Sequence, residues 1–151
     1  MKIKMLVMDV DGTLTDGKIY FGNEGEVMKA FNVKDGYAIA RLGDYDIISC
    51  IITGRVSEIV AKRAEDLKVT ELHQGVKDKL PLLRKVASKF GLDLSQVAYI
   101  GDDLNDLECI EACGLSACPA DAVEKIKIAA QYVCKAKAGD GAVREFIEYL
   151  K

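Results

Sequence analysis

The chain has 151 residues, half of them apolar and 30% charged, and its formal net charge is −3. This length suits one hydrophobic core, so we expect residues 1–151 to form a single domain. The acidic balance offers no basic surface for nucleic acid or an anionic membrane, and no apolar run approaches the ~20 residues that span a bilayer. The first residues lack the pattern of a signal peptide, and an odd number of cysteines, five, favours reduced thiols in the cytoplasm.

Apolar runs typical of buried strands alternate with helical patterns along the chain. This alternation predicts an α/β fold, a doubly wound parallel sheet covered by helices on both faces. The sequence predicts strands near 4–9, 47–52, 69–72, 97–101, 115–118 and 131–134. It predicts helices near 36–43, 55–67, 79–90, 104–112, 121–130 and 141–150.

The first predicted strand ends abruptly in two carboxylates with one residue between them, Asp9 and Asp11. Alternate residues of an extended segment share a face, so both should occupy one small volume at the carboxyl end of the strand, where open α/β sheets bind ligands. Two anions this close favour a bound divalent metal ion, because otherwise a raised pKa would neutralise one of them. The alternative interpretation is that Asp9 and Asp11 belong to an acidic turn that caps a following helix. Residues 17–21 are β-prone instead of helical, so this interpretation lacks its helix.

Residues 18–31 interrupt the alternation with two β-prone runs around a turn at residues 22–25. We expect a β-hairpin that projects from the sheet. Its apolar residues would be exposed unless a partner covers them, so we expect self-association through this hairpin. These residues are Tyr20, Phe21, Val27, Met28 and Phe31.

The segment NVKDG, residues 32–36, follows the hairpin. Its acidic residue, Asp35, is placed as the N-cap of the next predicted helix. Capping alone would explain Asp35, and Lys34 beside it is typical of a solvated surface lysine.

The second strand of the sheet should end at Thr53, Gly54 and Arg55. A hydroxyl and the backbone N–H groups of a glycine turn that opens a helix can cradle a phosphate, although Thr53 could also be a simple N-cap. Arg55 adds a planar donor for a carboxylate or phosphate. Arg63 lies further along the same helix and could share that face or form a surface salt bridge.

Two later segments carry charges that a scaffold alone does not need. Lys79 begins a predicted helix, where a cation is unfavourable unless an anion binds beside it. Asp102, Asp103 and Asp106 crowd together after the strand near 97–101. Asp102 is the best candidate for a third metal ligand, with Asp103 or Asp106 in position to orient ligands or water.

The segment DVDGTLTDG, which begins at Asp9, resembles the first motif of the haloacid dehalogenase-like phosphohydrolases. Further matches follow in the right order along nearly the whole chain: Thr53 in IITGR, Lys79 in GVKDKLP, and Asp102, Asp103 and Asp106 in YIGDDLND. Relatives often carry a cap domain after the hairpin region or between the lysine and the final aspartates. The segment between Lys79 and Gly101 has room for only one helix and a turn. We therefore expect a Rossmann-like core without a cap, open unless a neighbouring subunit closes it.

This resemblance implies a Mg²⁺-dependent phosphoric monoester hydrolase. The metal would be bound by the Asp9 carboxylate, the Asp11 main-chain carbonyl and Asp102. Asp9 would attack phosphorus to form an aspartyl-phosphate, while Asp11 would protonate the leaving alcohol and then deprotonate the attacking water. Thr53 and Lys79 would hold the phosphoryl oxygens.

Within the superfamily the chain resembles the small capless group of 3-deoxy-D-manno-octulosonate 8-phosphate phosphatases of lipopolysaccharide biosynthesis. The matching stretches are DVDGTLTDGKIYFGNEGE, KAFNVKDGYAI, IITGR, QGVKDKL, YIGDDLND and GAVREF. The group implies a homotetramer whose hairpins pack together and whose subunits close one another's sites. It also implies substrate contacts from Asp11, Asn32, Val33, Lys34, Asp35, Gly36, Gly54, Arg55, Arg63 and Lys79.

The chain departs from this group near its last helix. The group usually has an arginine between the glycines that precede AVRE, and this chain has Asp140 there. Arg144 on the last helix could remain at the surface or reach a neighbouring site.

Three alternatives stay open at this point. Relatives that act on nine-carbon sugar-acid phosphates are similar but tend to carry glutamate after TG, where this chain has Arg55. A phospho-accepting receiver domain shares the sheet and the aspartyl chemistry, but it places its aspartate after a middle strand, where this chain has Thr53. A non-catalytic oligomerisation module is the third, since similar domains are fused to sugar-acid cytidylyltransferases, but the intact set of acidic and basic residues argues against it.

Overall fold

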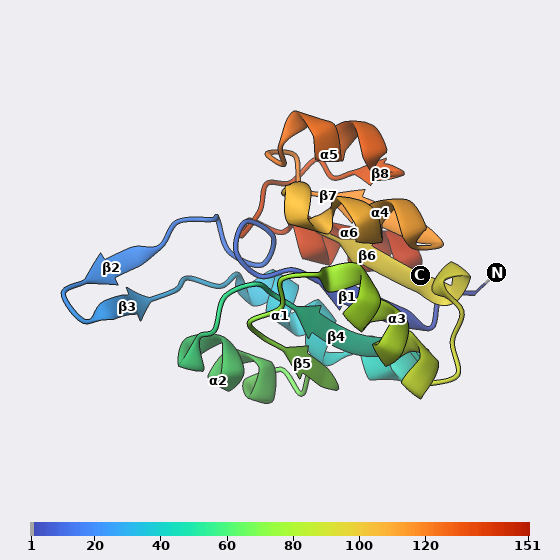
Figure 1. Ribbon diagram of the computed structural model, residues 1–151, viewed down its shortest axis with the longest axis horizontal. Helices are drawn as coiled ribbons and strands as arrows, with labels where there is room; N and C mark the ends of the chain where they lie inside the picture. Colours follow the sequence, from blue (N-terminus) through green and yellow to red (C-terminus); the bar gives the residue numbers. More distant parts are fainter. Residues whose placement is uncertain (1) are drawn as a thin grey trace.

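A six-stranded sheet lies between two layers of helices in the computed structural model, which describes residues 2–151 (Figure 1). All six strands are parallel, in the order β5-β4-β1-β6-β7-β8. Each strand overlaps a range predicted from its apolar run. The strands are β1 (Met5–Met8), β4 (Ile48–Ile52), β5 (Glu71–His73), β6 (Val97–Ile100), β7 (Leu115–Cys118) and β8 (Tyr132–Val133).

The helices divide between the two faces of the sheet. On one face α1, α2 and α6 share a hydrophobic cluster with the sheet, and on the other α3, α4 and α5 share a second cluster. This division makes the sheet doubly wound, as predicted. The helices are α1 (Val33–Ala40), α2 (Glu58–Asp66), α3 (Lys79–Lys89), α4 (Leu107–Ala112), α5 (Glu124–Ala129) and α6 (Ala142–Leu150).

The central strand β1 shows why an unbroken apolar run is needed here. Leu6 and Met8 belong to the cluster beneath α1, α2 and α6, whereas Met5 and Val7 belong to the opposite cluster. All four side chains are fully buried. Because burial of one such side chain stabilises a fold by about 1.5–3 kcal/mol, β1 anchors both layers and fixes the position of the residues that follow it.

The predicted hairpin is present and projects away from the carboxyl end of β1 (Figure 1). It consists of β2 (Tyr20–Gly22) and β3 (Gly25–Met28), paired antiparallel. Phe21 is 69% exposed and Val27 is 63% exposed, as expected for an uncovered hairpin. Phe31 is different: it is partly buried against the core beneath α1 and α2, so the expectation that it is exposed is wrong.

No cap domain interrupts the part of the chain that the structure describes. Between β1 and β4 the regular elements are the hairpin, α1 and a 3₁₀ turn, η1 (Leu42–Tyr45). Between Lys79 and Gly101 they are α3, a second 3₁₀ turn, η2 (Leu94–Gln96), and β6. A third 3₁₀ turn, η3 (Leu104–Asp106), leads into α4. No helix within residues 2–151 combines the length and apolar character needed to cross a membrane.

The start of α1 corrects one sequence prediction. The N-cap is Asn32, whose Oδ1 accepts the N–H groups of Lys34 at 2.8 Å and Asp35 at 3.3 Å. Asp35 lies inside the first turn, and its Oδ1 accepts the N–H of Arg144 at 2.8 Å. Asp35 therefore ties α1 to α6 instead of capping α1. Asparagine and aspartate cap helices equally well, so composition alone did not distinguish them.

The start of α2 corrects a second prediction. This helix begins at Glu58 and is capped by Ser57, whose hydroxyl accepts the Val60 N–H at 3.4 Å. Thr53 is therefore not an N-cap, and the turn at Thr53 does not open the helix directly.

Candidate active site

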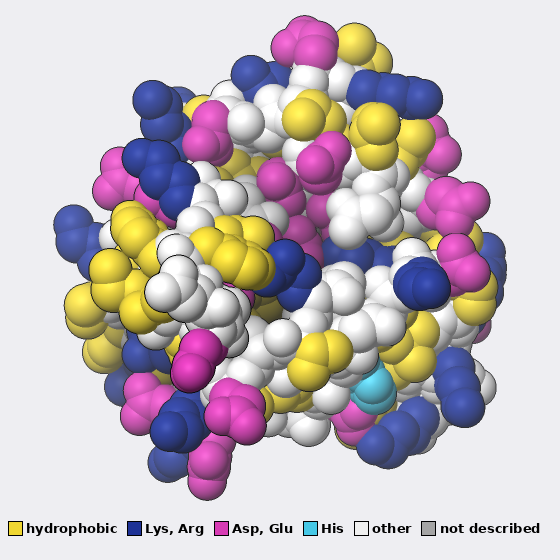
Figure 2. Space-filling model, turned by 60° about the vertical axis from the view of Figure 1, so that its left-hand side comes forward, with side chains coloured by type: hydrophobic (Ala, Val, Ile, Leu, Met, Phe, Trp, Pro, Cys, Tyr) yellow, Lys and Arg dark blue, Asp and Glu magenta, His cyan; other side chains and the backbone are white. Residues whose placement is uncertain are grey.

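A pocket of about 200 Å³ lies where the carboxyl ends of three neighbouring strands meet. β1 contributes the turn after Met8, β4 the turn after Ile52, and β6 the turn after Ile100. Figure 2 looks onto this end of the molecule, where acidic and basic side chains surround a central hollow. The pocket is lined by Asp9, Asp11, Thr53, Gly54, Arg55, Asp102, Asp103 and Asn105.

The first residue of α3, Lys79, supplies a buried cation beneath this pocket. Its ammonium donates hydrogen bonds to Asp9 Oδ1 at 2.9 Å and to Asp106 Oδ1 at 2.8 Å, and its side chain is fully buried. Burial alone would lower the pKa of Lys79, but the charges of Asp9 and Asp106 outweigh it and raise the pKa. Lys79 is therefore a permanent positive charge that joins two strand ends.

Both oxygens of Asp106 are engaged inside the protein. Oδ1 also accepts the Tyr99 hydroxyl at 2.5 Å, and Oδ2 accepts the N–H groups of Asp102 at 3.0 Å and Asp103 at 3.3 Å. A Cβ at Gly101 would lie 2.4 Å from Asp106 Cγ, so only glycine lets this carboxylate reach under the loop. Asp106 thus shapes the loop after β6 and holds Lys79.

Asp9 and Asp102 come from different strand ends and share one acidic centre with Asp106. Oxygen atoms of the three carboxylates lie within 4.8 Å of one another. Gly12 makes this approach possible: its φ is +85°, and a Cβ there would lie 2.0 Å from Asp102 Oδ2. The Thr13 hydroxyl donates to Asp102 Oδ1 at 3.2 Å and fixes the carboxylate from the other side.

The charge balance of this centre fits a divalent cation. Three carboxylates carry −3 and Lys79 carries +1, which leaves −2 in a mostly buried volume. Burial and the charge of Asp106 raise the pKa of Asp9, and burial and the charge of Asp9 raise the pKa of Asp102. An ion of charge +2 would remove this penalty, and oxygen ligands are those that Mg²⁺ prefers.

The turn after β4 forms the wall opposite Asp9. Thr53 is 2% exposed, and its N–H donates to the His73 carbonyl at 3.0 Å, which fixes the turn to β5. Gly54 and Arg55 also line the pocket. The Arg55 side chain is 43% exposed and its Nη2 lies 3.8 Å from Glu26 Oε2. This turn offers a hydroxyl, backbone N–H groups and a cation to an anionic ligand.

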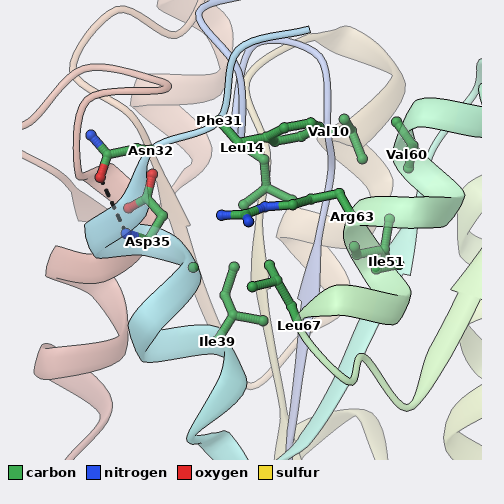
Figure 3. Close-up of a pocket in the computed structure, with 12 residues that line it drawn as sticks. Val10, Leu14, Phe31, Asn32, Asp35, Ile39, Ile51, Val60, Arg63 and Leu67 are labelled. Atoms are coloured by element: carbon green, nitrogen blue, oxygen red, sulfur yellow. Dashed lines mark hydrogen bonds between the residues drawn. The ribbon is translucent and has the colours of Figure 1, made fainter.

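Four of the other predicted substrate residues, Asn32, Asp35, Gly36 and Arg63, lie elsewhere, around a second cavity between α1 and α2 (Figure 3). Its volume is about 10 Å³, close to the space of one water molecule. The Arg63 side chain extends across it between Phe31 and Leu67. Asn32, Asp35 and Gly36 line it from α1, and no residue that lines it also lines the Asp9 pocket.

Two further predicted substrate residues, Val33 and Lys34, line neither pocket, and the same holds for Arg144 and Asp140, whose role the sequence leaves open. Val33 is 81% exposed on the outer side of α1, and Lys34 beside it is exposed. The Arg144 guanidinium lies 5.7 Å from the Tyr37 ring centre, and its Nε donates to Glu148. Asp140 is exposed in the loop before α6.

Two residues near the pocket, Lys29 and Glu26, were not predicted as site residues from the sequence. Lys29 follows β3, its side chain is fully buried, and its ammonium contacts Asp11 Oδ1. Glu26 lies on β3 and contacts both Lys29 and Arg55. No local signal marks either residue, because both belong to a segment whose pattern predicts an exposed hairpin.

Comparisons with known proteins agree with this geometry. A family model described as haloacid dehalogenase-like hydrolase matches residues 70–147. The 3-deoxy-D-manno-octulosonate 8-phosphate phosphatase KdsC of Yersinia pestis is 45% identical over 98% of this chain and 79% of its own length.

Solved structures give the same result. The 3-deoxy-D-manno-octulosonate 8-phosphate phosphatase of Moraxella catarrhalis, in complex with magnesium, phosphate and KDO, superposes with a TM-score of 0.95 at 41% identity, covering 98% of this chain and 85% of that one. The cobalt-bound deoxy-D-mannose-octulosonate 8-phosphate phosphatase of Haemophilus influenzae superposes with a TM-score of 0.96 at 38% identity, covering 99% and 87%. The chain belongs to the haloacid dehalogenase-like hydrolases and has their phosphatase core.

Proposed function

We propose that this protein is a Mg²⁺-dependent phosphatase that hydrolyses a sugar-acid phosphate monoester, 3-deoxy-D-manno-octulosonate 8-phosphate. The observation that carries the proposal is the centre formed by Asp9, Asp102 and Asp106 around Lys79, with Thr53 on the opposite wall. The relatives in Yersinia pestis and Moraxella catarrhalis act on this substrate by name, and they match the chain over almost its whole length. Residues 1–151 would act as one catalytic domain.

In the first step Asp9 is the nucleophile. Lys79 holds its Oδ1, so the other oxygen is available to attack phosphorus. A bond from that oxygen to phosphorus forms while the bond from phosphorus to the sugar oxygen breaks, and Asp11 gives its proton to the departing oxygen.

In the second step a water molecule attacks the aspartyl-phosphate at phosphorus. Asp11, now a carboxylate, takes a proton from this water, and inorganic phosphate leaves with Asp9 restored. The proton balance over both steps is zero, so Asp11 can serve both without a further group.

The remaining pocket residues bind and orient. The Thr53 hydroxyl, the Gly54 N–H and the Lys79 ammonium would hold the phosphoryl oxygens, with Asp103 and Asp106 fixing the loop after β6. Asp9, Asp102 and the main-chain carbonyl of Asp11 would hold Mg²⁺. When bound, this ion would offset the −2 charge and draw electron density from a phosphoryl oxygen.

Recognition of the sugar acid would need more than one chain. Arg55 reaches the pocket rim, whereas Asn32, Asp35, Gly36 and Arg63 line the second cavity, which is too small for a sugar, and Val33 and Lys34 are exposed. We infer a homotetramer packed through the hairpin, in which these residues contact the substrate of a neighbouring subunit. The five cysteines are buried and free, which suits the reducing cytoplasm, where we place the reaction.

The direct test is phosphate release with Mg²⁺ from a panel of eight- and nine-carbon sugar-acid phosphates. We expect the highest kcat/KM for the eight-carbon 8-phosphate and no turnover by Asp9→Asn. Asp46→Asn is the matched control, because Asp46 is exposed, distant from the pocket, and already in a left-handed conformation that asparagine tolerates.

Other outcomes would overturn the proposal in defined ways. A higher kcat/KM for the nine-carbon 9-phosphate would assign the substrate to that class. A stable phosphoprotein without turnover would indicate a receiver domain. No reaction with any ester would indicate a non-catalytic module.

A further inference from the structure

Glu26 ties the projecting hairpin to the turn that bounds the catalytic pocket. It lies on β3, but its partners outside the hairpin, Ser57 and Arg55, belong to the segment between β4 and α2. Its side chain is 14% exposed, so these contacts are largely shielded from solvent. Carboxylates are seldom buried to this extent unless cations or hydrogen-bond donors pair them. The contacts of Glu26 therefore join two parts of the molecule that are far apart in the sequence.

Glu26 is held in place from two sides. Its Oε1 accepts the Ser57 hydroxyl at 2.6 Å, and Ser57 is the N-cap of α2. Its Oε2 lies 3.1 Å from the ammonium of Lys29, whose side chain is fully buried. A carboxylate held at both oxygens keeps one orientation. Glu26 is thus a rigid anchor at the base of an otherwise exposed hairpin.

Arg55 is the further cation that this anchor faces. Its Nη2 lies 3.8 Å from Glu26 Oε2, and Arg55 forms no other ion pair within residues 2–151. Glu26 Oε2 is buried and accepts no hydrogen bond within the same residues, so it is an acceptor still available to the guanidinium. Arg55 also lines the catalytic pocket, with 43% of its side chain exposed.

A fixed carboxylate beside Arg55 affects ligand binding more than stability. Partly exposed ion pairs stabilise a fold very little. Ordering a long, mobile side chain when a ligand binds costs conformational entropy, and a carboxylate that already holds the guanidinium reduces this cost. A guanidinium has five N–H donors, so Arg55 can contact Glu26 and a carboxylate of a ligand at the same time.

We propose that Glu26 is a positioning residue that holds Arg55 at the rim of the catalytic pocket, where Arg55 recognises the carboxylate of a sugar-acid phosphate. The inference rests on the proposed phosphatase function and gives the hairpin a part in selecting the substrate within its own chain. Glu26 acts through Arg55, so it should affect binding of the sugar acid and leave phosphoryl transfer unchanged.

Two esters and two genetic backgrounds separate this role from a merely structural one. 4-Nitrophenyl phosphate carries the phosphoryl group but no carboxylate, so the position of Arg55 should not affect it. Loss of binding that is equal in the ground state and the transition state raises KM without lowering kcat. In a chain that lacks the Arg55 guanidinium, Glu26 has nothing left to position, and its replacement should add no further effect.

The experiment measures kcat and KM for the eight-carbon sugar-acid 8-phosphate and for 4-nitrophenyl phosphate, with Mg²⁺, in the wild type and four variants. For Glu26→Gln, which keeps the shape of the side chain, KM for the sugar-acid ester should rise about 3- to 10-fold, in the lower range of couplings between residues in contact. Its kcat, and both constants for the aryl ester, should change less than about twofold.

The other three variants complete the comparison. Arg55→Met should raise KM for the sugar-acid ester further, by about 10-fold or more, because it removes the carboxylate contact itself. Glu26→Gln/Arg55→Met should match Arg55→Met within about twofold. Glu24→Gln removes an exposed charge from the turn of the same hairpin and should change neither constant for either ester.

Three results would overturn the role of Glu26. One is an unchanged KM in Glu26→Gln or in Arg55→Met. Another is an equal effect of Glu26→Gln on both esters, or with and without Arg55, since either would mean that Glu26 supports the fold alone. The third is a lower KM in Glu26→Gln, which would mean that Glu26 competes with the substrate for Arg55.

Further outcomes concern folding and the function on which the inference rests. If Glu26→Gln does not fold, Glu26→Asp, which keeps the charge but withdraws it from Arg55, decides by the same criteria. A wild type that hydrolyses only the aryl ester would overturn the sugar-acid assignment, and the inference with it. A wild type that hydrolyses neither ester would overturn the phosphatase function as well.

Discussion

The two cavities of this protein contrast in how completely one chain pairs their buried polar atoms. In the catalytic pocket Lys79 pairs with Asp9 and Asp106 at hydrogen-bonding distance. In the second cavity Asp35 Oδ2 and Arg63 Nε are buried, and neither atom has a hydrogen-bond partner within residues 2–151. The contrast supports our proposal that the chemistry is built within one chain, whereas the residues that we propose to select the substrate lack contacts that one chain does not supply.

Metal removal should give the largest effect, because it leaves the −2 charge of Asp9, Asp102, Asp106 and Lys79 unbalanced. Chelation of Mg²⁺ is expected to reduce turnover of 4-nitrophenyl phosphate by about 10³-fold or more, as loss of several kcal/mol of transition-state stabilisation requires. Readdition of Mg²⁺ should restore the rate, and Asp102→Asn should not recover at the same Mg²⁺ concentration. Turnover that persists through chelation would contradict the metal centre.

Lys79→Met should have the next largest effect, on stability as well as on activity. It leaves Asp9 and Asp106 buried without their cation, which should lower the free energy of unfolding by about 3–5 kcal/mol. Urea denaturation measures this, and Lys79→Met/Asp106→Asn should recover part of the loss. Lys85→Met, an exposed lysine on the same helix, is the control. A Lys79→Met variant as stable as Lys85→Met would mean that the Lys79 ammonium does not stabilise the buried carboxylates of Asp9 and Asp106.

The hairpin offers a way to separate the two cavities. Val27→Asp places a charge on an exposed apolar face and should dissociate the tetramer that we propose, as sedimentation velocity would show. The kcat/KM for the sugar-acid ester should then fall about 10-fold or more, and that for the aryl ester should change less. Glu24→Gln at the hairpin turn is the control. A wild type that sediments as a monomer, or a Val27→Asp variant that stays assembled, would refute this interface.

Asp35→Asn should give the smallest effect, and its sign tests the second cavity. Burial raises the pKa of Asp35, and the N–H groups of Arg144 and Gly141 offset this only in part. For an acid with a raised folded-state pKa, stability is greatest below the ordinary pKa of 3.8 and declines as the pH rises through the folded-state pKa. Asparagine should therefore raise the free energy of unfolding at pH 7 by about 1 kcal/mol.

The advantage of Asp35→Asn should vanish below pH 3.8, where the unfolded carboxyl group is also protonated. Chemical denaturation at several pH values measures both limbs of this curve. A loss of stability at pH 7 would show that the Asp35 charge is paired in the native protein, which would remove the contrast between the two cavities.

Sequence patterns predicted the parts of this molecule that rest on burial and strand order. The strands could be located because each is an apolar run, and the carboxyl ends of parallel strands must lie at one edge of the sheet. This is why Asp9, Thr53 and Asp102 could be grouped although they lie far apart in the chain. The structure adds that Gly12, whose φ is +85°, lets the turn after β1 approach Asp102 closely.

The parts that could not be predicted depend on single side-chain contacts. Asn32 and Asp35 are interchangeable as caps by composition, and only the approach of α6 determines that Asp35 turns inward. Lys29 and Glu26 lie in a hairpin whose pattern indicates exposure, and their partners are on other elements. The partial burial of Arg63 between α1 and α2 likewise depends on packing that no local pattern encodes.

The claim that Asp9 performs the chemistry is tested most directly by the stereochemistry at phosphorus. A thiophosphate analogue of the substrate, made chiral at phosphorus with sulfur and two oxygen isotopes, is turned over in water labelled with the third oxygen isotope, and the configuration of the released inorganic thiophosphate is determined. Two successive in-line displacements, first by Asp9 and then by water, predict retention of configuration. Inversion would mean that water attacks the substrate directly, and it would contradict the role of Asp9 as nucleophile.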